Sequence, residues 1–454
     1  MAKGKPYLQN GIRHECITPV TTLDLELGIR ALADYRGKAR YVPEGEPGGS
    51  RAAERVLKSM QPAEVIDAVK AAGLRGKGGA AFPAGLKWSF VPKDSPGPKY
   101  LVINADEGEP GTFKDRFIME DAPHRLIEGA MIALYAFGGH DAYCYIRGEF
   151  YDCIRLLEEA VREAYSAGIL GERPFGVDYP LHFQVHPGAG AYICGEETAL
   201  LSSLMGERGH PRMKPPFPAV EGLWRRPTVI NNVETIATVP AIFDAGVEWF
   251  KARGTEKSPG IKAVSVSGCV RNPGWWEIEY GVPMRVIINE LAGGLMPGRQ
   301  LKAIIPGGSS CPVLRADKVD TPYDYESLAA AGSMLGSAAM IVLDDSVDMV
   351  RVMRNFSHFY AHESCGKCTP CREGTRWMLQ IHERILSGGG RVEDIDLLHD
   401  ITLGLDAKCF CPLGDAAAWP VKSAVERFRE DYERWVEKSV VVAGGGESEM
   451  AEAS

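Results

Sequence analysis

The first half of the chain alternates apolar and polar stretches in a way that predicts a parallel β-sheet. The apolar run at 100–103 ends in polar residues, as buried parallel strands do where a sheet binds its ligand. Further strands are expected at 142–146 and 181–185. The helix between them has one apolar face, made of Ile154, Leu157, Val161 and Tyr165. Alternating strands and helices indicate an α/β domain, which we place at residues 61–253.

The pattern changes in the next part of the chain. Residues 262–270 and 275–279 each alternate apolar and polar positions, with turn residues between them, which predicts a β-hairpin. A helix through 286–291 and a strand at 301–305 complete the pattern. These elements predict a small α+β domain over residues 261–345 without an obvious catalytic constellation.

Helical spacing dominates the rest of the chain and predicts a helical bundle over residues 346–438. A 4-3-4-3 spacing of Val421, Val425, Phe428, Tyr432 and Trp435 marks its last helical stretch. Residues 439–454 are rich in glycine and glutamate and predict a disordered tail. Residues 1–60 are expected to form a polar N-terminal extension, with a loop at 44–49.

Three cysteines in one loop of the predicted bundle, Cys365, Cys368 and Cys371, have the spacing C-x2-C-x2-C. Such a loop can supply three thiolates to one [4Fe-4S] cluster. A structural zinc site is the alternative, although zinc sites usually have two separated C-x2-C pairs. The fourth thiolate comes from Cys409 or Cys411, between which spacing cannot choose. We favour Cys411, because ferredoxin ligand runs also end in a Cys-Pro pair.

A glycine-rich loop at 73–83 contains Gly76, Lys77, Gly78 and Gly79. Glycines let backbone N–H groups approach a phosphate, and Lys77 and Lys87 offer countercharge. A helix precedes this loop, where a dinucleotide fingerprint should follow a strand. A tight surface turn is therefore the competing interpretation.

Two other polar segments, 104–109 and 188–198, stand where predicted strands end, and the pair Asn231–Asn232 follows later in the chain. Their carboxylates and amides could accept from ribose hydroxyls or bind the edge of a heterocycle. Each has a plainer explanation as well. Segment 104–109 could be a solvated acidic loop, Glu196 and Glu197 could cap a helix, and asparagine pairs are common in turns.

Composition excludes several classes of protein. Apolar residues make up 45% and charged residues 24% of the 454 residues, as in ordinary globular proteins. The net charge of −9, with no basic cluster, argues against nucleic-acid binding. Eleven scattered cysteines are not typical of a disulfide framework, and no apolar run is long enough for a membrane span. We therefore expect a cytoplasmic protein.

Taken in order, these motifs resemble the family of NADH-oxidising flavoprotein subunits of bacterial respiratory complex I, the NADH:quinone oxidoreductase. The resemblance runs from about residue 20 to 438. It implies a Rossmann-like FMN and NADH domain, a ubiquitin-like β-grasp (SLBB) domain and a four-helix [4Fe-4S] domain.

The resemblance also implies site residues. The cluster ligands would be Cys365, Cys368, Cys371 and Cys411. The flavin cradle would consist of Gly76, Lys77, Gly78, Gly79, Lys87, Asn104, Asp106, Glu107, Gly195, Glu196, Asn231 and Asn232. The NADH contacts would be Phe82, Phe90, Glu109, Tyr192, Glu197, Lys214 and Phe217.

The sequence departs from the family at three positions. Lys77 stands where the family usually has arginine, Ala81 where it has glycine and Ala84 where it has threonine. Lys77 keeps the charge but loses the bidentate fork. Ala81 is expected to add a methyl group near the nucleotide.

The implied activity is hydride transfer from NADH to FMN, then single-electron transfer to the [4Fe-4S] cluster and on towards quinone. No side chain is expected to act as acid, base or nucleophile. Glu196 and Glu197 are expected to tune the flavin potential or favour NAD⁺ release. Glu109 and its acidic neighbours would repel the 2′-phosphate of NADPH.

Such a chain cannot reach quinone alone, so the resemblance implies partners: a thioredoxin-like [2Fe-2S] subunit and a larger iron–sulfur subunit. Its place would be the peripheral arm on the cytoplasmic side of the inner membrane, with membrane contact only through the complex. The alternatives are a diaphorase subunit of an NAD-linked hydrogenase or formate dehydrogenase, and an iron–sulfur electron carrier without nucleotide turnover.

Overall fold

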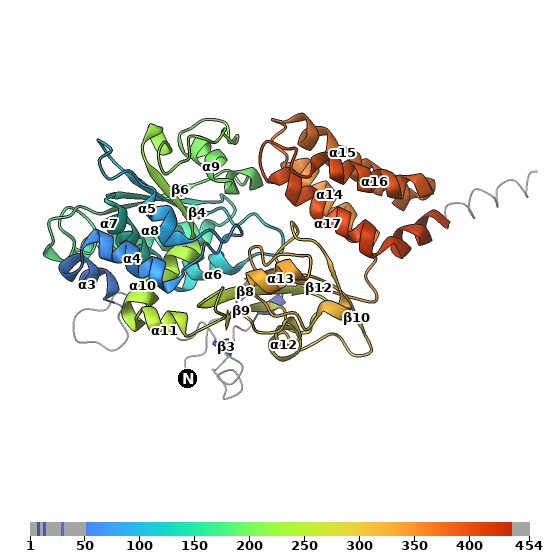
Figure 1. The fold of residues 1–454 in the computed structure, drawn as a ribbon, viewed down its shortest axis with the longest axis horizontal. Helices are drawn as coiled ribbons and strands as arrows, with labels where there is room; N and C mark the ends of the chain where they lie inside the picture. Colours follow the sequence, from blue (N-terminus) through green and yellow to red (C-terminus); the bar gives the residue numbers. More distant parts are fainter. Residues whose placement is uncertain (1–6, 10–11, 15–28, 31–50, 438–454) are drawn as a thin grey trace, which may run out of the picture.

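The computed structural model describes residues 7–9, 12–14, 29–30 and 51–437. The loop expected at 44–49 and the tail expected at 439–454 lie outside these residues. In the described part of the chain, no helix combines the length and the apolar character needed to cross a bilayer. The chain forms an α/β domain, a second domain around a mixed sheet and a C-terminal helical domain, arranged in that order along the sequence (Figure 1).

The α/β domain is built on a four-stranded sheet in the order β6-β5-β4-β7, in which all neighbours are parallel. The predicted strands are confirmed as β4 (Tyr100–Ala105), β5 (Asp141–Ile146) and β6 (His182–Pro187), and β7 is Thr228–Asn232. Alternate residues of β4 enter different cores, because successive side chains of a strand point to opposite faces.

Helices pack against one face of this sheet and enclose the largest core. They include α3 (Ala52–Ser59), α4 (Pro62–Ala72), α7 (Pro123–Phe137), α8 (Tyr151–Ser166) and α10 (Val233–Ala245). Glycine ends α4 as expected, with Gly73 in the left-handed conformation at φ 70°. Helix α3 belongs to this core as well, although the sequence placed it in the N-terminal extension.

The second domain contains a six-stranded sheet in the order β11-β10-β12-β8-β9-β3. The predicted hairpin is confirmed as β8 (Ile261–Gly268) and β9 (Gly274–Glu279), which pair antiparallel. Strand β12 (Ala339–Asp344) lies parallel to β8 and antiparallel to β10 (Leu301–Ile305). The other strands are β11 (Leu314–Arg315) and β3 (Ile29–Arg30). A separate hydrophobic core lies between this sheet and its helices, among them α13 (Tyr325–Ala330).

The helical domain consists of α14 (Met349–Glu363), α15 (Thr369–Arg384), α16 (Val392–Leu405) and α17 (Leu413–Arg427). The helical stretch through Trp435 is interrupted, because the backbone leaves the helical region at Phe428 (φ −135°, ψ 35°). Residues 429–437 resume the helix. The apolar spacing persists across the break because both segments cover the same core.

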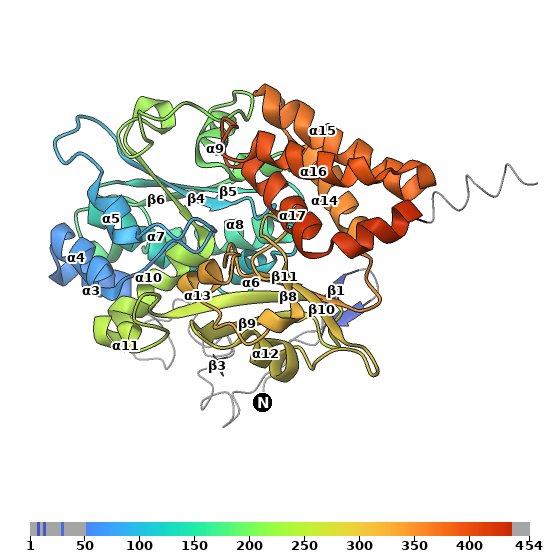
Figure 2. The ribbon, with the colours of Figure 1, turned by 45° about the vertical axis from the view of Figure 1, so that its right-hand side comes forward.

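The mixed sheet lies beside the α/β domain and beneath the helical domain (Figure 2). One continuous core joins the second face of the parallel sheet, α9 (Glu197–Leu204) and the four helices. The three domains therefore meet near the loops that follow β4 and β6.

Candidate functional site

The predicted flavin residues gather at the carboxyl ends of β4 and β7, which are adjacent in the sheet. Asn104 donates its side-chain N–H to the carbonyl of Gly195 at 2.8 Å, which joins the end of β4 to the loop after β6. Asn231 accepts from the indole N–H of Trp88 at 2.9 Å. Asn232 caps α10 by accepting from the backbone of Glu234 at 3.0 Å.

The glycine-rich loop lies between α4 and α5 (Ala84–Ser89), so a helix does precede it. A Cβ on Gly78 would come within 2.9 Å of the Cβ of Asn232, whereas one on Gly79 would meet nothing within 4 Å. Glycine therefore lets the loop touch the end of β7 while its other side stays open. Lys77 is 2% exposed, and its ammonium donates to Thr238 at 2.9 Å and to the carbonyl of Ile261 at 2.7 Å. Its charge is directed into the protein.

Two carboxylates follow β4 and have different surroundings. Asp106 is 2% exposed, and its Oδ1 has no hydrogen-bond partner among the described residues. Burial, aided by Glu149 and Glu363, raises its pKa to about 7 against the influence of Arg147. Glu107 instead accepts from the backbone N–H groups of Asp115 and Arg116 at 2.6 and 2.9 Å. Burial and Asp115 raise the pKa of Glu107 to about 8.

Glu196 and Glu197 begin α9, and the expectation of helix capping is met by Glu196. Its Oε2 accepts from the backbone N–H groups of Thr198 and Ala199, both at 2.9 Å. Glu197 lies between two cations, 3.1 Å from the ammonium of Lys87 and 2.8 Å from that of Lys214. Burial opposes ionisation of Glu197, but the two lysines prevail and lower its pKa.

The predicted nucleotide residues differ in exposure. Phe82, Phe90 and Phe217 are 44%, 50% and 58% exposed, and the first two rings lie 6.1 Å apart. Exposed aromatic rings are suited to stacking on a base. Glu109, by contrast, accepts from the hydroxyl of Tyr192 at 2.6 Å. Burial raises the pKa of Glu109.

The four predicted cluster ligands line one small cavity between α15, α17 and the loop after β6. Cys409 is not among the lining residues; its Sγ lies beside Gly414, where an added Cβ would clash with it, and it interacts with Cys368. Burial raises the pKa of Cys371 and Cys411 to about 11 and about 12. The cavity is lined by Ile193, Pro211, Ser364, Cys365, Lys367, Cys368, Cys371, Phe410, Cys411 and Leu413.

Two residues in contact with the site are not among the predicted flavin, nucleotide or cluster residues. Ser310 belongs to the second domain, yet its backbone N–H donates to Glu109 at 2.7 Å. Glu363, beside the cysteine loop, accepts from the backbone of Tyr192 at 3.0 Å. Only tertiary contact brings these residues to the site, so spacing along the chain could not identify them. Glu234, by contrast, stands two residues after the Asn231–Asn232 pair. A charged residue next to this predicted site segment was a usable signal that it lies near the site.

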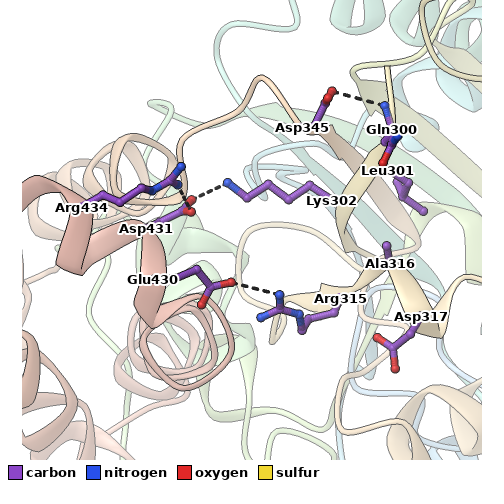
Figure 3. A pocket seen from close by; sticks show the side chains of 10 residues that line it. All are labelled: Gln300, Leu301, Lys302, Arg315, Ala316, Asp317, Asp345, Glu430, Asp431 and Arg434. Carbon is purple, nitrogen blue, oxygen red and sulfur yellow. Dashed lines mark hydrogen bonds and ion pairs between the residues drawn. The ribbon is translucent and has the colours of Figure 1, made fainter. Parts of the chain in front are cut away.

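A larger pocket lies away from these residues, between β10, β11 and residues 430–434 (Figure 3). Its cations are bound by its own acids: Lys302 and Arg434 pair with Asp431, and Arg315 lies 3.0 Å from Glu430. The predicted site residues lie elsewhere. The pocket therefore contributes nothing to the candidate flavin or cluster site.

Comparison with known families decides the assignment. The family described as Nuo51 FMN-binding domain matches residues 69–241, and the SLBB domain matches residues 262–342. The NADH-ubiquinone oxidoreductase-F iron-sulfur binding region matches residues 351–435. The second F subunit of NADH-quinone oxidoreductase of Rhizobium meliloti is 50% identical over 391 residues, which cover 86% of this chain and 93% of the relative. This chain belongs to the family of NADH-quinone oxidoreductase F subunits.

Other relatives in this family agree. The F subunit of Mycobacterium tuberculosis is 51% identical over 419 residues, 91% of each chain, and that of Streptomyces coelicolor is 52% identical over 84% of this chain and 85% of the relative. Among solved structures, an NAD⁺-reducing [NiFe]-hydrogenase in the H2-reduced state matches with a TM-score of 0.77 and 35% identity. That match covers 85% of this chain but only 64% of the hydrogenase chain.

The residues present suit the cofactors of this family. An unpartnered, buried Asp106 oxygen and the open side of Gly79 fit a ligand that carries hydroxyl and phosphate groups. Thiols that share one cavity fit an iron–sulfur cluster. The expected FMN and [4Fe-4S] cofactors are supported by the family matches, and the zinc alternative is not.

Proposed function

We propose that this chain is the NADH-oxidising subunit of a respiratory NADH:quinone oxidoreductase. The family match along almost the whole chain carries this proposal, since it includes both the FMN-binding domain and the iron-sulfur region. Bound FMN would supply a hydride acceptor, and the [4Fe-4S] cluster a one-electron acceptor. The protein's own contribution is to bind and orient.

The roles of individual side chains follow from their surroundings. Lys87 and Lys214 hold Glu197 ionised at the start of α9, where it would set the negative charge near the bound nucleotide. The hydroxyl of Tyr192 and the N–H of Ser310 fix the carboxyl of Glu109. The exposed aromatic rings of the site are available to stack on the adenine of NADH. No acid, base or nucleophile is required.

The partners follow from the reaction. Electrons that leave the cluster need further carriers, for which we propose a thioredoxin-like [2Fe-2S] subunit and a larger iron–sulfur subunit. In such a complex the chain would occupy the peripheral arm on the cytoplasmic side of the membrane.

A diaphorase subunit of an NAD-linked hydrogenase is the second candidate, because a hydrogenase chain shares the fold. It is less well supported. The relatives from NADH-quinone oxidoreductase are about as long as this chain, whereas the hydrogenase chain is covered only to 64%.

Anaerobic titration of the purified chain tests the proposal. Absorbance of bound flavin should bleach with NADH and remain with NADPH. A chain that holds iron and sulfide but no flavin would contradict the proposal and favour an electron carrier. A control with Cys365→Ala should keep the bleaching of flavin, because the ligands of the two cofactors are separate.

A further inference from the structure

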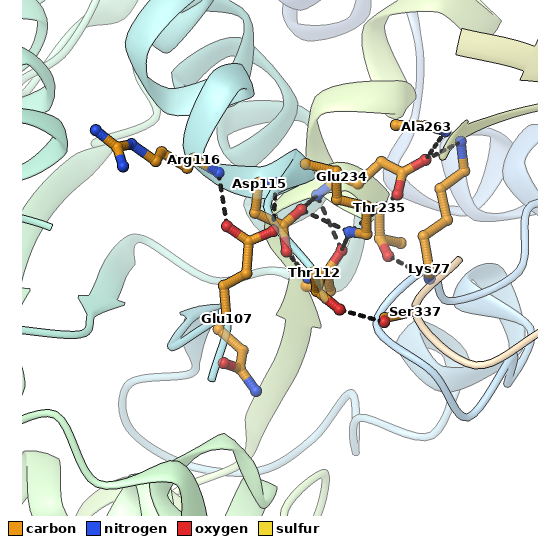
Figure 4. Close-up of polar contacts among 12 residues, drawn as sticks. Lys77, Glu107, Thr112, Asp115, Arg116, Glu234, Thr235, Ala263 and Ser337 are labelled. Carbon is orange, nitrogen blue, oxygen red and sulfur yellow. Dashed lines mark hydrogen bonds and ion pairs between the residues drawn. The ribbon is translucent and has the colours of Figure 1, made fainter. Parts of the chain in front are cut away.

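A cluster of buried charges reaches the glycine-rich loop through Lys77, and the function proposed above gives its ion pairs no role (Figure 4). Three lysines, Lys77, Lys114 and Lys262, surround the carboxylate of Glu234. We call these four residues the Glu234 cluster. All four are at most 4% exposed. Burying charges is costly, so a cluster of this kind needs close mutual contact to persist.

The contacts of Glu234 are short. Its Oε2 binds the ammonium of Lys262 and lies 3.0 Å from that of Lys114, while its Oε1 lies 3.5 Å from that of Lys77. The backbone N–H of Ala263 also donates to Oε1 at 2.8 Å. Burial alone would raise the pKa of Glu234, but Lys262, Lys114 and Lys77 together lower it. Glu234 therefore remains a carboxylate.

The three lysines come from different parts of the fold. Lys77 belongs to the glycine-rich loop, Lys114 begins α6 (Lys114–Asp121), and Lys262 belongs to β8 in the second domain. The Lys77 nitrogen has three separate partners, which are Glu234, Thr238 and the carbonyl of Ile261. Separate acceptors around one point suit an ammonium better than a planar guanidinium. This explains lysine where the family usually has arginine.

The cluster also reaches Asn232, one of the predicted flavin residues. Lys114 lies 2.7 Å from Asp115, which in turn accepts from the amide of Asn232 at 2.6 Å. Asn232 is the residue that Gly78 of the loop approaches. Both walls of the flavin cradle, the loop and the end of β7, are thus tied to one carboxylate.

We propose that Glu234 and Lys262 are positioning residues for the flavin. By gathering Lys77, Lys114 and Lys262, the carboxylate of Glu234 sets the distance between the glycine-rich loop and Asn232. The second domain takes part in flavin binding through Lys262. Other contacts act in the same direction: Tyr325 donates to the carbonyl of Gly76 at 3.1 Å, and Glu326 pairs with Arg75 at 2.6 Å.

This inference rests on the proposed FMN site, and its test separates the two. Full-length chains with Glu234→Gln, Lys262→Met or both are purified, and FMN is removed and titrated back by its fluorescence. Leu57→Ala is the matched control, because it opens a cavity on α3 in the hydrophobic core that α10 also joins. Helix α3 contacts α10 at the end far from Glu234, where Arg55 donates to the carbonyl of Phe243. The iron–sulfur signal reports that the rest of each chain is folded.

We expect each single variant to bind FMN at least about tenfold more weakly, since each breaks the buried ion pair between Glu234 and Lys262. The double variant should lose less FMN affinity than the product of the two single-variant losses, because it removes one charge of each sign. Hydrogen exchange of the flavin-free chain should quicken at residues 74–79 and 231–233. Leu57→Ala should lower the melting temperature without changing FMN affinity or this exchange.

Unchanged FMN affinity in both single variants would overturn the inference. So would a loss of FMN affinity in Leu57→Ala as large as the loss in the single variants. If Glu234→Gln does not accumulate as a folded protein, FMN affinity and hydrogen exchange of Lys262→Met test the inference instead. A wild-type chain without FMN affinity would contradict the proposed function instead. Exchange in the flavin-free chain would then still show whether the cluster holds the loop.

Discussion

At the scale of single residues, the cluster cavity favours Cys411 over Cys409 as the fourth ligand, a choice that the cysteine spacing left open. Both cysteines have the right distance from the C-x2-C-x2-C loop in sequence, and only Cys411 lines the cavity with the other three. We predict that Cys411→Ala loses the intact [4Fe-4S] signal in electron paramagnetic resonance, while Cys409→Ala keeps it. The reverse result would make Cys409 the fourth ligand.

Asp106 is expected to make stability depend on pH. Its pKa is 3.8 in the unfolded reference and about 7 in the folded chain, so the folded state holds this proton more tightly. Unfolding free energy must therefore fall as pH rises from about 4 to about 7. We predict that Asp106→Asn removes this loss, on the order of a few kcal/mol. Urea unfolding of both flavin-free chains from pH 4 to 8 measures it, and a constant difference would contradict the assignment.

At the scale of elements, the glycine-rich loop depends on the absence of a side chain at Gly78. Alanine there would force Asn232 aside, because the new Cβ would lie 2.9 Å from its Cβ. We predict several-fold weaker FMN binding for Gly78→Ala and a loss of about 1–3 kcal/mol in stability. Gly404→Ala on α16 is the control. With nothing within 4 Å, it should stabilise that helix by about 0.5–1 kcal/mol.

Ala81 in the same loop was expected to add a methyl group near the nucleotide, but in the structure it packs elsewhere. The residue is 9% exposed and packs into the core of the second domain. Its φ of 56° is left-handed, a region where glycine is favoured. We predict that Ala81→Gly leaves the dissociation constant for NADH unchanged. Titration of flavin bleaching measures it, and tighter binding would show that the methyl group does face the nucleotide.

Helices and strands were predicted correctly where the hydrophobic periodicity and the turn or capping residues indicated the same boundaries. The strands β4, β5 and β10 and the hairpin β8–β9 followed from apolar runs and turn residues, and Gly73 ended α4. The break at Phe428 could not be predicted, because an apolar spacing shows which side of a segment faces the core and not whether the backbone is continuous. For the site, the motifs identified segments. They could not show that the Lys77 ammonium turns inward, since its acceptors on Thr238 and Ile261 lie 161 and 184 residues away in sequence.

At the scale of the whole molecule, Lys367 connects the cluster loop to the nucleotide domain. It lines the cluster cavity, its ammonium binds the carbonyl of Pro211, and it lies 4.1 Å from the ring of Phe410. A cation beside a cluster favours the reduced state. We predict that Lys367→Met lowers the midpoint potential of the [4Fe-4S] cluster in a redox titration. Lys408→Met is the control, because that lysine binds Leu403 at 2.8 Å outside the cavity and should leave the potential unchanged.

The Glu234 cluster has a consequence for the order in which the protein is made. A ribosome releases the strands β4 to β7 before it has synthesised Lys262, Tyr325 or Glu326, on which the glycine-rich loop depends. Domains usually fold in the order of synthesis, so the parallel sheet can form early. If the Glu234 cluster positions the flavin as proposed, the cradle is completed only after these later residues are made. We therefore expect nascent chains to capture FMN only after residue 326 has been made, when the iron–sulfur domain is about to follow. The interval in which an unfinished chain could carry a reduced flavin without its electron acceptor is thereby shortened.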